Sequence, residues 1–332
     1  MGKCARTKSR NVGCEQGLRK SAPAVKKLAS APVAALATAA SELRASVIPG
    51  MTGEQRTPVP NAAPIPGQEE PVPGVAVSKA LNWGGRRRHD RGWRNCMSAA
   101  KGTRITWLGH ATVLVRTPQG TTLLIDPFIA QNPKYPKEFE LPSKIDYILL
   151  THGHFDHMAD VVPVARKHGA TVVAIYELAD FVAKKGVAET IGMNLGGTVQ
   201  LKDVAATMLE SKHSSGAQDE NGTHYVGIAT GFVLTVADGP VLYHSGDTAV
   251  FGDMALIREL YAPKVVMLPI GGHYTMGPRE VALAARLLAP EVILPIHFGT
   301  FPPLTGTPAQ VAALVGGGVE VVEWKPGEEY VA

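Results

Sequence analysis

The chain contains the stretch Thr151-His152-Gly153-His154-Phe155-Asp156-His157, which holds three imidazoles and one carboxylate within six residues. The apolar run before it, residues 145–150, is typical of a buried strand. Imidazole and carboxylate groups are ligands of zinc and similar divalent ions. The two histidines of the His-Gly-His segment point the same way in an extended loop, so they can share one ion, and the Asp-His pair can serve a second. The stretch therefore predicts a metal site, and a solvated polar loop is the alternative.

Three further candidate ligands lie downstream, each just beyond an apolar run that is predicted to be a strand. These are His213 after residues 205–209, Asp247 after residues 241–243, and His297 after residues 292–296. Taken alone, a histidine after a strand is more often a hydrogen-bonded structural residue than a ligand. The first loop favours the metal interpretation, because its four donors cannot complete two coordination shells without such partners. We expect all of them to gather at the ends of a sheet sandwich.

These motifs, in this order, resemble those of the metallo-β-lactamase superfamily. The resemblance covers about residues 103–332 and includes the His-x-His-x-Asp-His loop, the later His, the Ser-Gly-Asp-Thr turn and the last His. A finer resemblance is to uncharacterised metal-dependent hydrolases related to sugar-phosphate lactonases. Four segments carry it: residues 107–112 (WLGHAT), 124–128 (LIDPF), 268–278 (LPIGGHYTMGP) and 297–303 (HFGTFPP).

The resemblance implies an α/β fold, an αββα sandwich of two mixed β-sheets with flanking helices, where periodicity alone predicts only α/β. It implies that a first metal is held by His152, His154 and His213, a second by Asp156, His157 and His297, and that Asp247 bridges them. No ligand position is missing. His154 is not replaced by Glu, as it is in the diiron oxygen-reducing relatives, and no flavin-binding domain follows.

Two divalent ions would supply a hydroxide nucleophile and polarise the substrate, with Asp156 as the catalytic residue that orients this nucleophile. Zn²⁺ is the favoured metal, with Mn²⁺ or Fe²⁺ as alternatives. We therefore expect a binuclear metal-dependent hydrolase acting on a small, anionic or ester-like substrate such as a lactone or phosphodiester. The alternatives are a phosphodiesterase acting on a lipid or nucleotide, and a metal-binding or redox protein without hydrolytic turnover.

Four other residues are candidates for contacts around the metals or to substrate. His110 lies between two predicted strands, 104–109 and 112–117, and is equally a candidate for a structural hydrogen bond. Asp126 ends the predicted strand 121–125 and can accept the second ring N–H of a ligand histidine, although it could be a turn former. His273 and Thr275 lie in a Gly-rich loop and are expected to reach substrate.

The remaining pattern alternates between helices and strands. Helices are expected at residues 158–168, 177–185, 253–261, 278–288 and 308–315. Strands are expected at residues 170–175, 264–268, 291–296 and 318–323, with a strand pair over 225–236.

Residues 1–100 have a different composition from the rest. Seven prolines lie between Pro49 and Pro73, and the low apolar content predicts a disordered, basic, Pro-rich extension rather than a second domain. Residues 101–332 are expected to form the hydrolase domain. The basic start could be a targeting segment; alternatively, the natural protein starts at Met97 and the preceding residues are an annotation artefact.

Charge is divided in the same way. Residues 1–104 hold 18 Lys and Arg against 6 acidic residues, whereas residues 105–332 hold 15 against 23. The net charge of about −8 on the second part argues against nucleic acid as a partner and leaves a small molecule as the expected one. No stretch reaches membrane-spanning length. All three cysteines precede residue 97, which suggests no disulfide framework, and a cytoplasmic location is expected. Oligomeric state is not predicted.

Overall fold

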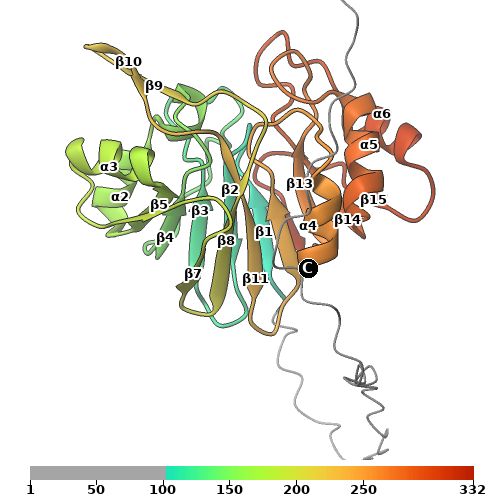
Figure 1. The fold of residues 1–332 in the computed structure, drawn as a ribbon, viewed down its shortest axis with the longest axis horizontal. Coiled ribbons are helices and arrows are strands. Elements are labelled where there is room, and N and C mark those ends of the chain that lie inside the picture. Colours follow the sequence, from blue (N-terminus) through green and yellow to red (C-terminus); the bar gives the residue numbers. More distant parts are fainter. Residues whose placement is uncertain (1–101) are drawn as a thin grey trace, which may run out of the picture. The chain divides into compact units, whose positions relative to one another are not determined.

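The computed structural model describes residues 102–332. They form two mixed seven-stranded sheets that face one another, with helices outside them (Figure 1). This confirms the predicted αββα sandwich. The predictions for residues 1–100, among them disorder and a start at Met97, lie outside the described residues.

The two sheets are built alike. The first has the order β16 (Glu329–Val331), β1 (Arg104–Trp107), β2 (Val113–Arg116), β3 (Thr122–Ile125), β4 (Tyr147–Leu149), β5 (Thr171–Ile175) and β6 (Thr190–Met193). The second has the order β7 (Thr198–Leu201), β8 (Val204–Glu210), β11 (Thr230–Val236), β12 (Val241–His244), β13 (Val265–Pro269), β14 (Val292–Ile296) and β15 (Glu320–Val321). In each order, three antiparallel pairings are followed by three parallel ones.

Strand alternation separates the two layers of the core. In β13, Val265 and Met267 belong to the cluster between the sheets, whereas Val266 and Leu268 belong to a second cluster beneath the helices. Because successive side chains of a strand point to opposite faces, an apolar strand of this kind is buried on both sides. The sheets are therefore fixed against each other and against their helices.

Six helices cover or extend the sheets. These are α1 (Phe155–Met158), α2 (Val161–His168), α3 (Tyr176–Lys184), α4 (Met254–Tyr261), α5 (Pro278–Leu288) and α6 (Pro308–Val315). α2 and α3 contact β5 of the first sheet, and α6 contacts β15 of the second. Within residues 102–332, none is long and apolar enough to cross a lipid bilayer.

Two expectations about secondary structure were wrong in detail. The helix predicted at 158–168 begins only at Val161, as α2, and the short helix α1 precedes it. Between the two, Asp160 donates its N–H to the Pro127 carbonyl, and its carboxylate accepts from the N–H groups of Ile129 and Ala130. These bonds turn the chain between the helices.

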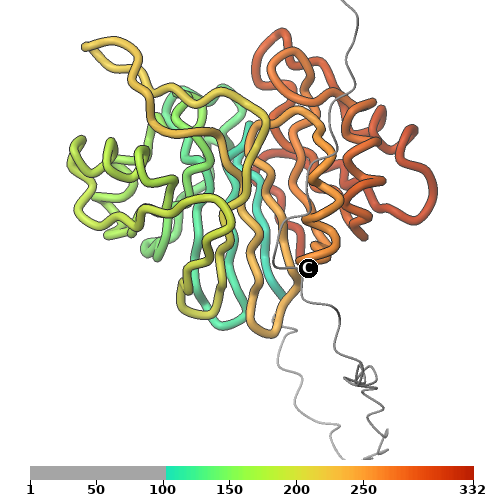
Figure 2. Tube along the Cα trace, in the orientation of Figure 1, coloured from blue at the N-terminus to red at the C-terminus, as the bar shows by residue number. Residues whose placement is uncertain are grey.

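The strand pair predicted over 225–236 is instead the single strand β11. Residue 225 ends a separate hairpin, formed by β9 (Gly216–Asp219) and β10 (Gly222–Tyr225). The hairpin projects from one end of the sandwich (Figure 2). Its turn contains Asn221-Gly222, with Gly222 at φ 112°, a signal of hairpins that the sequence already carried.

Candidate metal centre

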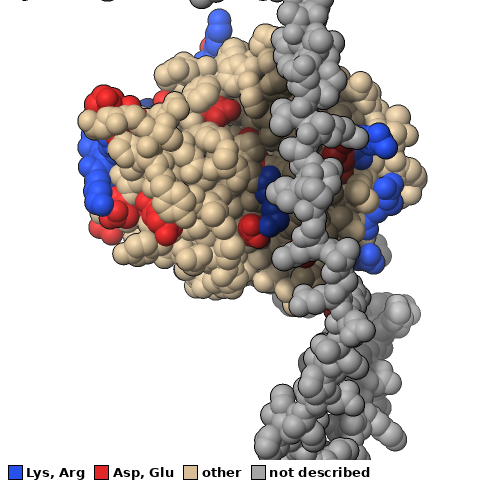
Figure 3. Space-filling view, turned by 45° about the horizontal axis from the view of Figure 1, so that its top comes forward, with Lys and Arg blue, Asp and Glu red and all other residues tan. Residues whose placement is uncertain are grey.

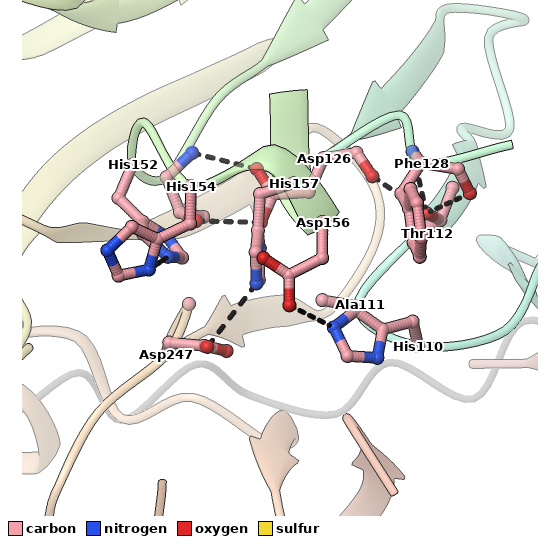
Figure 4. A network of polar contacts seen from close by, with 12 residues as sticks. His110, Ala111, Thr112, Asp126, Phe128, His152, His154, Asp156, His157 and Asp247 are labelled. Carbon is pink, nitrogen blue, oxygen red and sulfur yellow. Dashed lines mark hydrogen bonds and ion pairs between the residues drawn. The ribbon is translucent and has the colours of Figure 1, made fainter. Parts of the chain in front are cut away.

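The predicted donors converge at one end of the sandwich. After β4, the loop contributes His152 and His154, and the short helix α1 contributes Asp156 and His157. The loops after β8, β12 and β14 contribute His213, Asp247 and His297. Ends of parallel strands lie at the same edge of a sheet, so loops distant in sequence meet there. Figure 4 shows the side chains of the first loop turned toward Asp247.

The first group of donors is His152, His154 and His213, whose donor atoms lie within 4.8 Å of one another. His152 Nε2 and His154 Nδ1 are 3.0 Å apart. Two nitrogens bound to one tetrahedral zinc ion are separated by about 3.3 Å, so this spacing suits a shared ion. Thr151 Oγ1 lies 3.0 Å from His152 Nδ1, which leaves Nε2 of that ring facing its neighbours.

The second group contains Asp156, His157, His297 and also His110, again with donor atoms within 4.8 Å. His157 Nδ1 lies 2.8 Å from Asp126 Oδ2, so the ring can donate to this carboxylate and aim Nε2 at the centre. Asp126 thus lies where it orients a donor histidine, as expected from its position after β3.

Asp247 lies between the two groups. Its Oδ2 is 3.0 Å from His297 Nε2, 3.3 Å from His157 Nε2 and 3.7 Å from His213 Nε2. One carboxylate oxygen therefore faces donors from both groups.

Unpaired polar atoms at the centre fit a bound cation. His157 Nε2, His297 Nε2 and Asp247 Oδ1 are buried and make no hydrogen bond of good geometry, although the two ring nitrogens lie close to Asp247 Oδ2. Such atoms are rare in folded proteins, because each costs about 1–3 kcal/mol when it is left unsatisfied. Three of them in one cluster of imidazole and carboxylate donors are explained if metal ions bind there.

The pKa shifts of two residues at the centre also fit a bound cation. Burial alone lowers the pKa of His157, but the carboxylates of Asp247 and Asp126 raise it well above its usual value. Burial raises the pKa of Asp247, but His297 and His157 lower it well below its usual value. The cluster thus favours positive charge at His157 and an ionised Asp247, and a divalent cation supplies that charge.

His110 contacts the second group directly. Its Nε2 lies 3.0 Å from Asp156 Oδ2, and its ring lies 3.9 Å from that of His297 (centroid to centroid). Burial and the neighbouring His297 lower the pKa of His110 to about 4, so the ring is neutral near pH 7 and its Nε2–H donates to Asp156. His110 therefore fixes the orientation of the Asp156 carboxylate.

Several of these residues adopt backbone conformations that side chains rarely take. The φ angles of His110, Asp126 and His297 are 56°, 48° and 53°. A non-glycine residue in this left-handed region costs of order 1 kcal/mol, and such residues cluster at functional sites. Here the strained conformations place three side chains around one centre.

A cavity of about 970 Å³ opens over this centre. Its walls include the donors His154, Asp156, His213, Asp247 and His297. Tyr274 lines it, whereas His273 and Thr275, on either side of Tyr274, do not; His273 is exposed and its ring lies against Tyr274.

The sequence interpretation missed most of the remaining wall. Phe155, Tyr225, Tyr274 and Phe301 line the cavity, together with residues of the β9–β10 hairpin. Aromatic residues beside the metal motifs were the available signal, since Phe155 lies inside the first motif and Phe301 follows His297 closely. Tyr225 could have been found only through the hairpin.

Comparisons with known proteins identify relatives of this chain. A family profile described as beta-lactamase superfamily domain matches residues 121–298. A UPF0173 metal-dependent hydrolase of Koribacter versatilis is 49% identical over 230 residues, covering 69% of this chain and 98% of the relative. One of Rubrobacter xylanophilus is 49% identical over 232 residues, covering 69% and 96%. Among solved structures, the metallo hydrolase Igni18 of Ignicoccus hospitalis matches with a TM-score of 0.62 and 36% identity, covering 69% of this chain and 97% of that one.

Proposed function

Because this chain belongs to the beta-lactamase superfamily and is a metal-dependent hydrolase, we propose that it uses two divalent metal ions to hydrolyse a small ester-like substrate, a lactone or a phosphodiester. The observation that carries the proposal is the position of Asp247 Oδ2 between the two donor groups. Between these two substrates, the sequence resemblance to hydrolases related to sugar-phosphate lactonases favours a lactone.

In this proposal His152, His154 and His213 hold one ion, Asp156, His157 and His297 hold the other, and Asp247 contacts both. Histidine-rich sets of this kind suit zinc, and manganese or iron(II) fit them as well. When bound, two such ions lower the pKa of a water molecule and polarise the carbonyl or phosphoryl oxygen of the substrate.

The protein's own contribution is to orient the reacting groups. Asp156 lies at the cavity wall, and although burial raises its pKa, the hydrogen bond from His110 and the proximity of His157 lower it more. Asp156 is therefore ionised near neutral pH and can orient the attacking water. His110 keeps the carboxylate in place, and Asp126 does the same for the His157 ring.

Replacement of His154 by alanine tests the proposal. We expect the wild-type full chain, purified without chelator, to hold about two divalent ions, and His154→Ala to lose metal and most turnover together, because a donor of the first group is gone. Metal per chain is measured by elemental mass spectrometry, and hydrolysis is followed with lactones and phosphodiesters.

A matched control is His168→Ala, since His168 ends α2 and its ring faces the Ser143 carbonyl rather than the donor groups. This variant should keep its metal and its activity. Full metal content with full activity in His154→Ala would contradict the assignment, and two irons with oxygen consumption would favour redox chemistry.

A further inference from the structure

We infer that the part of the substrate lying away from the scissile bond is uncharged and apolar, and that an aromatic wall carried partly by the β9–β10 hairpin holds it. This inference rests on the proposed hydrolase function and assigns a substrate class to the same site. It narrows the sequence-based expectation, which included anionic substrates.

The charge of the cavity wall is the first argument. Among the described residues that line it, no lysine or arginine is present, and the carboxylates of the wall, Asp156 and Asp247, belong to the donor groups. Binding sites for phosphate or carboxylate tails rely on arginine or lysine, which make charge-assisted hydrogen bonds to them. On the face shown in Figure 3, Lys and Arg side chains lie at the two sides, at the top edge and at one place near the middle. His224 also lines the cavity, but its Nε2 is paired with Asp219 Oδ1 at 2.7 Å. A remote anionic group would therefore enter this cavity without a lysine or arginine to balance its charge.

The second argument is the exposure of large aromatic rings around the centre. Phe155 and Tyr274 are each 57% exposed and Tyr225 is 75% exposed, although all three line the cavity. The Phe155 and Phe301 rings lie 6.4 Å apart, centroid to centroid. Exposed apolar surface grouped at a cavity marks a binding site, because a ligand that covers it removes that surface from water. Flat apolar groups suit such rings best.

The hairpin presents Tyr225 through strand alternation. Tyr225 is paired with Gly216, and Thr223 with Gln218, so these residues share one face of the hairpin, and all four line the cavity. Gly216 has no side chain opposite Tyr225, which leaves the ring room on this face.

The other face of the hairpin anchors it to α3. Asp219 accepts hydrogen bonds from Lys185 Nζ at 2.5 Å and from His224 Nε2 at 2.7 Å. Lys185 Nζ also lies 5.4 Å from the centre of the Phe181 ring, which in turn lies 5.4 Å from His224. Because the outer face is held by these contacts, the inner face has a defined position over the metal centre.

Two matched substrate pairs test the inference with the metal-loaded full chain. The first is γ-phenyl- against γ-carboxy-γ-butyrolactone, and the second is 4-nitrophenyl phenyl phosphate against its 4-carboxyphenyl analogue. We expect kcat/KM to be at least about tenfold higher for the phenyl member of whichever pair is hydrolysed, since the carboxylate is desolvated without a partner. Equal rates, or preference for the carboxylate, would overturn the inference.

Tyr225→Ala should lower kcat/KM for the phenyl substrate about tenfold, mainly through KM, while Tyr225→Phe retains the wild-type value. Tyr176→Ala is the matched control, because Tyr176 is 66% exposed at the start of α3 and does not line the cavity. Metal content should be unchanged in all three variants.

A binding measurement separates this inference from the reaction itself. The neutral fluorescent probe N-phenyl-1-naphthylamine should bind the wild-type full chain and Tyr176→Ala alike, and bind Tyr225→Ala several-fold more weakly. If neither substrate pair is hydrolysed but Tyr225→Ala weakens probe binding, the proposed reaction is contradicted and the apolar binding site is supported. Equal probe affinity in wild type and Tyr225→Ala would refute the apolar wall, even if the protein is an active hydrolase.

Discussion

The fully buried carboxylate of Asp126 contacts Thr151 and His157 directly, and reaches His152 through Thr151. Its Oδ1 accepts from the Thr151 N–H at 2.8 Å, and its Oδ2 accepts from Thr151 Oγ1 at 2.7 Å and from His157 Nδ1 at 2.8 Å. Thr151 Oγ1 also contacts His152. A single residue that is not itself a predicted ligand thus orients histidines of both donor groups.

Replacing Asp126 by alanine should weaken metal binding by about 10–100-fold, because the His157 ring is no longer held. The unfolding free energy of the metal-free protein should fall by about 2–3 kcal/mol, since the buried Thr151 N–H loses its acceptor. Metal affinity is measured by competition with a chelator, and stability by urea unfolding.

Asp126→Asn is the control for side-chain size. Its amide oxygen can still accept a hydrogen bond from Thr151 or His157, so metal affinity and unfolding free energy should fall less than in Asp126→Ala. Wild-type metal affinity in Asp126→Ala would show that Asp126 does not orient the site.

Among the elements, the β9–β10 hairpin is the one whose two faces make different contacts. The face that carries Tyr225 borders the cavity. The other face is tied to Lys185, at the end of α3, through Asp219, and His224 of this face contacts Phe181 of α3 and also reaches the cavity wall. The strands at its base approach the first metal loop closely, since a Cβ on Gly153 would lie 3.2 Å from the Ala217 nitrogen and 2.5 Å from Val226. The hairpin therefore links the helix layer to the centre.

Asp219→Ala should release the hairpin from α3 without affecting the metal site. We expect amide hydrogen exchange of residues 216–225 to become faster, and KM for the phenyl substrate to rise, because Tyr225 is no longer held in place. Exchange is followed by mass spectrometry on the full chain.

The control is Asp180→Ala, which removes another ion pair of α3, that between Asp180 and Lys184. It should leave exchange in the hairpin unchanged. Unaltered exchange in Asp219→Ala would mean that other contacts hold the hairpin.

In the whole domain, the centre depends on the apposition of two similar sheets. The parallel strands β3 and β4 of the first sheet lead to Asp126 and the His-rich loop, and β12 and β14 of the second lead to Asp247 and His297. A polar contact also joins the two sheets at the ends of their strands. The Lys202 Nζ, in the β7–β8 turn, lies 2.5 Å from Asp146 Oδ1, just before β4.

Asp146 makes stability depend on pH. Burial raises its pKa, but hydrogen bonds from Lys202, the Thr122 N–H and Lys144 lower it more, so the net shift is downward. A carboxyl whose pKa is depressed on folding stabilises the protein above its unfolded pKa of about 3.9, and this stabilisation is lost as the pH falls through the folded value.

Asp146→Asn should therefore lower the unfolding free energy of the metal-free protein by about 1 kcal/mol at pH 7, a modest value because Lys202 is partly exposed. The difference from wild type should shrink once the pH falls below about 4. Urea unfolding at several pH values measures it, and an equal difference at every pH would show that the charge of Asp146 is irrelevant.

Much of this centre could be predicted from the sequence, because the candidate donors form short motifs or directly follow apolar runs. Four candidate donors within one heptapeptide, and three more directly after apolar runs, point to metal chemistry whatever the arrangement of the strands. The resemblance to a known superfamily then supplied the αββα sandwich, which hydrophobic periodicity alone could not, since alternation identifies strands but not their order in a sheet.

The tertiary structure decided which side chains meet. His110 and Asp156 are 46 residues apart, and their hydrogen bond exists because β1 and β4, the strands that precede them, end at the same edge of the first sheet. The aromatic wall arises in the same way, from Phe155, Tyr225, Tyr274 and Phe301 on four separate segments. The sequence by itself determined the chemistry of the donors, because ligand type is a property of single residues. The place of Asp247 between the donor groups and the aromatic wall above them depend on distances between loops, which only packing of the two sheets fixes.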